Sequence, residues 1–152
     1  MSQYPSGPIA IFDPAHLTGA PAPTRTVSGG IYGIGIDSHD NLYVLETGAH
    51  TIHVYVARIL TLIRTISGPN TLLNNPGTLA LDASGRLYVT NANQVTVYSP
   101  GANGNVAPIA VVGGANTNIQ DQGAPVVAPN GSLYLSTTLQ NAVLIFAPLF
   151  TP

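Results

Sequence analysis

One phrase recurs three times along the chain and constrains its fold more than any other feature. It reads LYVLET at 42–47, LYVTNA at 87–92 and LYLSTT at 133–138, so successive copies begin 45 and 46 residues apart. A period of about 40–50 residues is typical of β-propeller blades, whereas leucine-rich and most helical repeats are shorter. The period therefore predicts blades of a propeller.

Each phrase lies within a unit that has the pattern of four short strands. A strand-like run and a tight turn precede it, in GIGIDSHDN, TLALDASGR and PVVAPNGS, where Asp, Asn, Ser and Gly favour turns. A further run follows it, in TIHVYVA, QVTVYSP and AVLIFAP, and a run closed by glycine stands ahead of each hairpin as the first strand of the unit, in TRTVSGG, LIRTISG and PIAVVGG. We therefore expect one all-β domain over 1–152, almost without helix, with four-stranded blades at 24–57, 62–100 and 108–148.

The stretches GIGIDSHDNLYVLETGAHTIHVYVA and GTLALDASGRLYVTNANQVTVYSPGANGNVAPI resemble NHL-type propeller repeats. They share the core G-[IL]-x-[IL]-D-x-x-[GD]-x-LYV, and the resemblance covers nearly the whole chain. The third repeat is the loosest match because Ala128 stands where the other two have Asp. NHL-type propellers include scaffolds, peptide or RNA binders and some enzymes, so the resemblance implies a fold and leaves the function open.

An additional strand-like run, PIAIFDP at 8–14, matches the last strands of the units but precedes the first unit. It is similar to the clasp strand of many propellers. Three blades are too few to close a ring, and an open array would expose apolar faces and strand edges. Three arrangements remain open: two chains that close a six-bladed ring, chains stacked head to tail in an open assembly, or a longer protein that supplies further blades.

We expect assembly contacts on two kinds of segment. One is the pair of strands at the ends of the array, which strand donation would use. The other is the apolar connector ARILTLI, which is read either as a contact surface or as a tightened turn packed on its own blade. The candidate residues are Ile9, Ile11, Phe12, Val143, Ile145, Phe146, Ile59 and Leu60.

The charge pattern excludes several partners. Charged residues are 7% of the chain and the formal net charge is −2, so no basic footprint exists for nucleic acid or an anionic lipid surface. The longest apolar stretch, 54–66, is interrupted by Arg58 and Arg64 and is too short to cross a bilayer. The first residues contain no signal peptide, while the low charge and the Asn- and Gly-rich loops favour a place outside the cell or on its surface.

Few residues are candidates for chemistry. His50 and His53 form an H-x-x-H pattern, but residues three apart on a strand point to opposite faces, so we predict surface histidines and no metal or other cofactor. Asp37 and Asp82 recur at the end of the second strand of their units, and we expect their side chains to fix the turn by accepting backbone N–H bonds.

The leading interpretation is a non-enzymatic scaffold or binding module that acts through self-assembly or partner binding, by ring closure or by strand donation between chains. Two alternatives stay open. One is a hydrolase or lyase of the gluconolactonase-like or streptogramin-lyase-like kind, with a composite site in the central channel. The other is an extracellular structural fibre subunit, because a nearly neutral surface promotes association.

Overall fold

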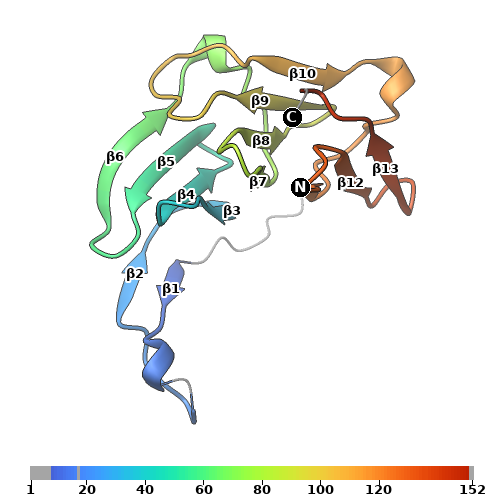
Figure 1. Cartoon of the computed structure of the whole chain (residues 1–152). Coiled ribbons are helices and arrows are strands. Elements are labelled where there is room, and N and C mark those ends of the chain that lie inside the picture. Colours follow the sequence, from blue (N-terminus) through green and yellow to red (C-terminus); the bar gives the residue numbers. More distant parts are fainter. Residues whose placement is uncertain (1–7, 17, 151–152) are drawn as a thin grey trace.

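The computed structural model describes residues 8–16 and 18–150 and contains four antiparallel sheets (Figure 1). Three of them follow the repeats, and we call them blades 1, 2 and 3. Blade 1 consists of β3 (Ile31–Ile36), β4 (Asn41–Glu46), β5 (Thr51–Val56) and β6 (Thr61–Ile66). Blade 2 consists of β7 (Leu79–Leu81), β8 (Leu87–Thr90), β9 (Gln94–Tyr98) and β10 (Ala110–Gly113). Blade 3 consists of β11 (Pro125–Val127), β12 (Leu133–Thr137) and β13 (Ala142–Phe146).

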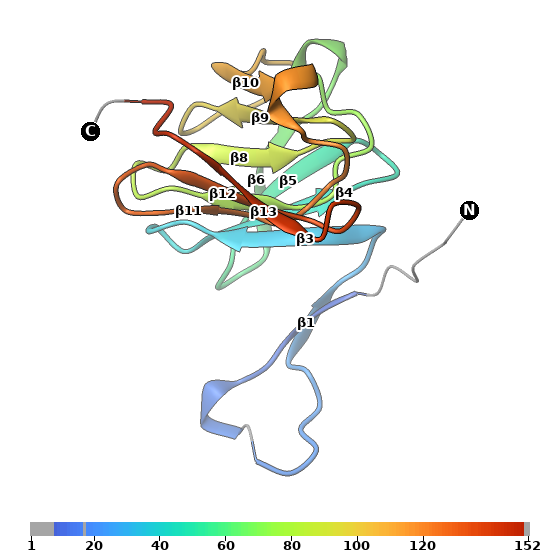
Figure 2. The same cartoon turned by 90° about the vertical axis from the view of Figure 1, so that its right-hand side faces the viewer.

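The fourth sheet is a two-stranded ribbon of β1 (Ile9–Ile11) and β2 (Arg25–Val27). Both views of the chain show this ribbon projecting away from the three blades (Figures 1 and 2). The described helices are short 3₁₀ turns, and none of them is long and apolar enough to cross a membrane. They are η1 (Pro14–His16), η2 (Pro69–Thr71) and η3 (Ala115–Thr117). The prediction of an all-β chain is confirmed.

The strands are grouped into blades differently from the prediction. The run at 62–68 forms β6, which pairs with β5 as the outermost strand of blade 1 and does not open blade 2. In the same way, the run at 108–114 forms β10 at the outer edge of blade 2. The predicted boundaries 24–57, 62–100 and 108–148 are therefore displaced by one strand toward the N-terminus.

The connection between β5 and β6 shows why β6 belongs to blade 1. The backbone N–H groups of Ile59 and Leu60 both donate to the carbonyl oxygen of Val56, at 3.2 and 2.8 Å, and Leu60 adopts a left-handed backbone with φ 53°. This tight turn folds β6 back onto β5. The apolar connector is thus a hairpin turn within one blade, and not a link between two blades.

Two hydrophobic clusters hold the blades together, one at each contact between neighbours. Alternate side chains of a strand point to opposite faces, so each blade presents two apolar faces. Blade 2 uses both, because its Leu87 and Val89 belong to the cluster with blade 1, while Tyr88 and Val97 belong to the cluster with blade 3. Blades 1 and 3 each have only one of their faces covered by a described blade.

The innermost strands of blades 1 and 2 approach closely, because glycine replaces a larger residue on β3. A Cβ atom on Gly35 would lie 2.6 Å from Cδ1 of Leu79, and one on Gly33 would lie 3.0 Å from Cα of Thr78. The inner strands β3, β7 and β11 contact one another in order and form the inner side of a curved array.

Candidate assembly interface

The recurring acids Asp37 and Asp82 hold the β3–β4 and β7–β8 turns, as predicted. Oδ1 of Asp82 accepts hydrogen bonds from the backbone N–H groups of Ser84 and Arg86, both at 2.9 Å, and Oδ2 lies 2.6 Å from Nε of Arg86. Asp37 makes the same pair of backbone bonds to His39 and Asn41, at 2.8 and 3.0 Å. Both carboxylates are therefore occupied by structural contacts.

The pKa of Asp37 reflects this turn. Partial burial acts to raise the pKa, but hydrogen bonds from the side chain and backbone of Asn41 and from the backbone of His39 stabilise the carboxylate, and the pKa lies below its ordinary value. Asp121 shows the same balance, because burial is outweighed by bonds from Leu139 and Thr138, and its pKa is also lowered.

The repeated tyrosines of blades 1 and 2 have a structural role. The hydroxyls of Tyr43 and Tyr88 each donate to Oδ2 of the acid in their own blade, at 3.4 Å. Tyr43 also accepts a 2.9 Å bond from Nη2 of Arg64. Both rings are buried between blades, whereas Tyr134 of blade 3 is 37% exposed.

The two candidate histidines lie in different surroundings. His50 is in the β4–β5 turn, where its Nε2 accepts a bond from the backbone N–H of Asn75 at 3.4 Å. His53 is on β5, with Nδ1 3.1 Å from Oγ1 of Thr65 and Nε2 4.0 Å from Oε2 of Glu46. In the part of the chain that the structure describes, no three His, Asp or Glu side chains group closely enough to hold a metal ion.

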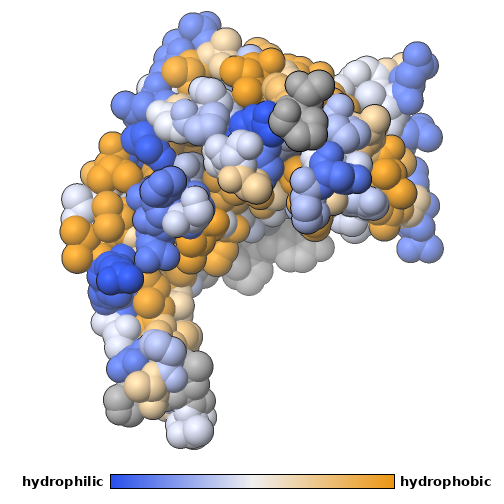
Figure 3. All heavy atoms as spheres, in the orientation of Figure 1, coloured by the Kyte–Doolittle hydropathy of each residue, from blue (hydrophilic) through white to orange (hydrophobic). Residues whose placement is uncertain are grey.

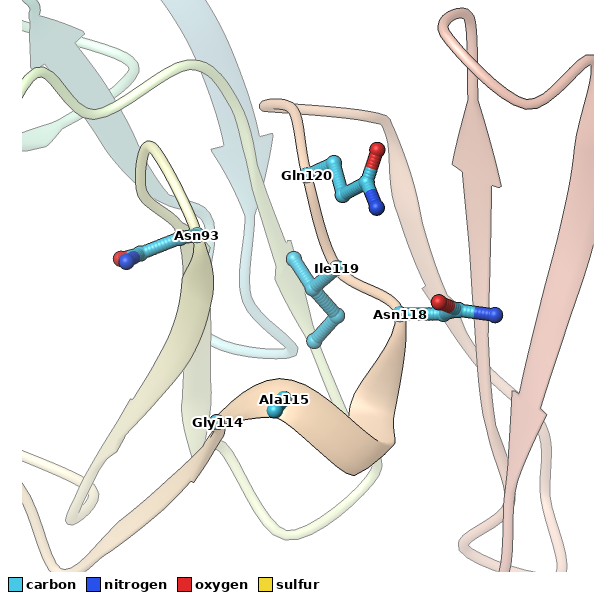
Figure 4. A pocket seen from close by; sticks show the side chains of 6 residues that line it. All are labelled: Asn93, Gly114, Ala115, Asn118, Ile119 and Gln120. Carbon is cyan, nitrogen blue, oxygen red and sulfur yellow. The ribbon is translucent and has the colours of Figure 1, made fainter.

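A small pocket of about 210 Å³ lies between the β8–β9 turn and η3 (Figure 4). Its polar side chains do not converge, because the amides of Asn93 and Asn118 point in opposite directions. Ile119 contributes to the hydrophobic cluster between blades 2 and 3. This pocket is a gap between packed structural elements, and its described polar groups do not point toward a common ligand.

The outer face of blade 1 is the first apolar surface that no described blade covers. Ile34 and Ile36 on β3 are 54% and 61% exposed. The pairing register places Ile34 beside Val44 and Ile36 beside Leu42, so these side chains share one face of the sheet. Val44 and Leu42 are buried, so the exposed part of this face lies along β3. Blade 2 packs on the opposite face, where Tyr43 and Leu45 are buried.

The outer face of blade 3 is the second uncovered apolar surface. Val126, Tyr134 and Ile145 are cross-strand neighbours on β11, β12 and β13, and the two aliphatic residues are 60% and 66% exposed. Figure 3 shows apolar residues gathered over β6 and over β13, near the two ends of the array. The sequence-based expectation of exposed apolar ends agrees with these positions.

Blade 3 also has an open strand edge. Its strand order is β11-β12-β13, whereas β6 and β10 stand in fourth place in blades 1 and 2. No described strand pairs with the outer edge of β13. The prediction that AVLIFAP completes blade 3 is therefore wrong, because this run forms the third strand of the blade and leaves the fourth place empty.

The predicted assembly residues divide between three places. Ile9, Ile11 and Phe12 belong to the β1 segment of the ribbon, and Ile59 and Leu60 belong to the β5–β6 turn, where Ile59 is 67% exposed. On β13, Val143 and Ile145 point to the uncovered face, and Phe146 packs against the cluster shared with blade 2. The end faces contain further apolar residues that the sequence reasoning did not single out: Ile34, Ile36 and Val126.

Solved structures identify the architecture. The chain is similar to hydrazine synthase from Kuenenia stuttgartiensis, with a TM-score of 0.61 and 18% identity over 78% of this chain and 32% of that chain. It is also similar to a streptogramin B lyase, with a TM-score of 0.51 and 13% identity over 81% of this chain and 42% of that chain. The chain has a β-propeller fold. A luciferin-regenerating enzyme shares this propeller fold, with a TM-score of 0.50 and 15% identity over 95% of this chain and 51% of that chain.

These likenesses concern part of each larger propeller, since the chain spans between 32% and 51% of the three lengths. No protein-family model matches the sequence. No curated protein matches it either. At identities of 13–18%, the similarity establishes the fold alone.

Proposed function

We propose that this chain is a non-enzymatic propeller module, related to NHL-type repeats, that works by assembling with further blades. The observation that carries the proposal is the pair of uncovered apolar faces at the two ends of the array. Interior blades bury such faces, and an exposed contiguous apolar face is typical of an interaction surface. The low charge of the chain, 7% of residues, favours association further.

The side chains available for chemistry support a role in assembly rather than catalysis. Asp37 and Asp82 stabilise turns within their own blades, and Asp121 holds the β12–β13 turn through bonds to Thr138 and Leu139. A catalytic site in the central channel of a complete ring would need side chains from further blades in addition to blades 1, 2 and 3.

The experiment is absolute mass in solution by size exclusion with light scattering, at several concentrations. A discrete species at a multiple of 15.6 kDa is the expected result, because each chain leaves two faces to cover. A single species of 15.6 kDa at every concentration would contradict the proposal. A broad distribution that grows with concentration would favour open stacking of chains over a closed ring.

A further inference from the structure

The β1–β2 ribbon has the pairing register of the outer half of a propeller blade. Its register pairs Ile9 with Val27, as Ile52 pairs with Ile66 in blade 1. The sequence of β2 and the residues after it, RTVSG at 25–29, nearly repeats RTISG at 64–68, which contains the end of β6. By register and sequence, β2 therefore corresponds to a fourth strand and β1 to a third strand.

A hydrogen bond beside the ribbon supports this equivalence. The backbone N–H of Thr24 donates to the carbonyl oxygen of Ile11 at 2.7 Å, and the backbone N–H of Ile109 donates to Val97 at the same distance ahead of β10. The ribbon thus reproduces the pairing of β9 with β10, although no inner strands accompany it among the described residues.

The place of β2 along the chain shows which blade it belongs to. The fourth strand of blade 1, β6, leads into the first strand of blade 2, and β10 leads into the first strand of blade 3. β2 likewise precedes the first strand of blade 1, although only residues 28–30 join it to β3, whereas residues 67–78 and 114–124 make the other two connections. Its position along the chain therefore corresponds to the fourth strand of a blade that precedes blade 1. Blade 3 is the blade whose fourth place is empty.

The two end faces correspond to the two sides of an interior contact. The pairs Ile34–Val44 and Ile36–Leu42 of blade 1 occupy the positions of Leu79–Val89 and Leu81–Leu87, the face of blade 2 that packs on blade 1. In blade 3, Val126–Tyr134–Ile145 occupies the positions of Ala80–Tyr88–Val97, the face of blade 2 that packs on blade 3. Placing blade 1 of one copy against blade 3 of another would continue the array with the same geometry.

We propose that a second copy of this chain covers both end faces and donates its β2 to the outer edge of β13, so that two copies close a six-bladed ring with two reciprocal exchanges. The inference rests on the proposed function and names the partner and the strand. In the single chain β2 pairs with β1, whereas in the ring β2 pairs with β13 of the other copy. The repeat register then pairs Val143 with Val27 of the partner subunit, as Ile52 pairs with Ile66.

The ribbon is suited to such an exchange. A two-stranded ribbon alone is only marginally stable, whereas a fourth strand on blade 3 joins a packed sheet. β1 has three residues against five in β13, and its neighbour Phe12 is 42% exposed. The four residue steps from Val27 to Ile31, the first paired residue of β3, reach about 14 Å, which is less than the ~17 Å diagonal between the fourth strand of one sheet and the first strand of the next. The exchange therefore also requires Ile31 and Tyr32, at the irregular start of β3, to leave the sheet, and the six steps to Gly33 then reach about 20 Å.

Disulfide trapping tests the exchange directly, because the chain contains no cysteine. Cross-strand neighbours have the Cα separation that a disulfide needs. In the Val27→Cys/Val143→Cys variant, mild oxidation should give a covalent dimer as the main band on a denaturing gel without reductant. Each single variant should remain a monomer on the same gel.

A second pair provides the matched control. Ile9→Cys/Val27→Cys locks β2 onto β1 within one chain, and it should lower the dimer fraction measured by light scattering by at least tenfold until reductant is added. If the unmodified chain is a dimer but Val27→Cys/Val143→Cys gives no covalent dimer, strand exchange is wrong while assembly stands. A closed loop within one chain would show that β13 accepts its own β2 and would also overturn the exchange. A monomeric mass with no crosslink would overturn both proposals.

Discussion

Replacing Ile34 by Arg should separate the copies without unfolding the blades. Ile34 is 54% exposed, whereas Leu79 at the equivalent position of the interior contact is 6% exposed, so assembly should bury about half of the side chain. That burial is worth about 1 kcal/mol, and forcing an unpaired guanidinium into the apolar contact costs about 2 kcal/mol more. A two-copy ring contains this contact twice, so the total of about 6 kcal/mol corresponds to a rise in Kd of about 10⁴-fold.

The assay is sedimentation velocity over a wide concentration range, with circular dichroism to confirm the β content. Ile109→Arg is the control, because Ile109 is 49% exposed on blade 2, away from both end faces. The Ile34→Arg chain should sediment as a monomer at concentrations where the control and the unmodified chain are dimers. If both variants dimerise equally well, the outer face of blade 1 is not part of the interface.

Two further predictions concern stability. Gly123→Ala should lower the free energy of unfolding by about 3 kcal/mol, because the new Cβ would overlap the carbonyl oxygen of Ser136. Gly48→Ala, with no atom within 4 Å of its Cβ, should change it by less than about 1 kcal/mol, and equal melting temperatures for the two variants would refute the close packing. The lowered pKa values of Asp37 and Asp121 mean that their contribution is present above the unfolded pKa of about 4 and is lost as the pH falls through the lower folded values. Urea unfolding should therefore give a smaller free energy at pH 3 than at pH 7, and a larger value at pH 3 would contradict the assignment.

The sequence predicted the repeat, the all-β class and the role of the recurring acids. These features could be predicted because they are local: strand alternation and turn residues repeat with the 45- and 46-residue period, and an Asp beside a turn bonds to the nearest N–H groups. Asp37 and Asp82 illustrate this, since each accepts bonds from residues two and four positions later.

The grouping of strands into blades could not be predicted in the same way, because it depends on which turn is a hairpin. The β5–β6 turn contains no glycine, and Leu60 adopts its left-handed backbone without a residue type that signals it. The sequence did contain one unused signal, the recurrence of G-x-N-T at 68–71 and 114–117. This motif forms η2 and η3, which carry the chain from the outer strand of one blade toward the next.

The end faces show a second limit of the sequence reasoning. The exposed residues on β3 and β11 have the same apolar types as buried ones, so Ile34 cannot be told from Leu79 by pattern alone. Only the position of a blade at the end of the array leaves its face open. Val143 and Ile145 are candidates because the sequence of their strand resembles that of β1. The register of the ribbon accounts for this resemblance, since β1 and β13 both correspond to the third strand of a blade.

Amide hydrogen exchange tests most directly whether another copy completes the outer edge and face of blade 3. In the unmodified chain, the alternate β13 amides that point away from β12 should be protected nearly as well as the amides of β9, the third strand of a complete blade. In Ile34→Arg the protection of these outer-edge amides should be lost, while that of β9 is kept. Rapid exchange of the outer-edge amides of β13 in the unmodified chain, at concentrations where β9 is fully protected, would contradict completion of blade 3 by another copy.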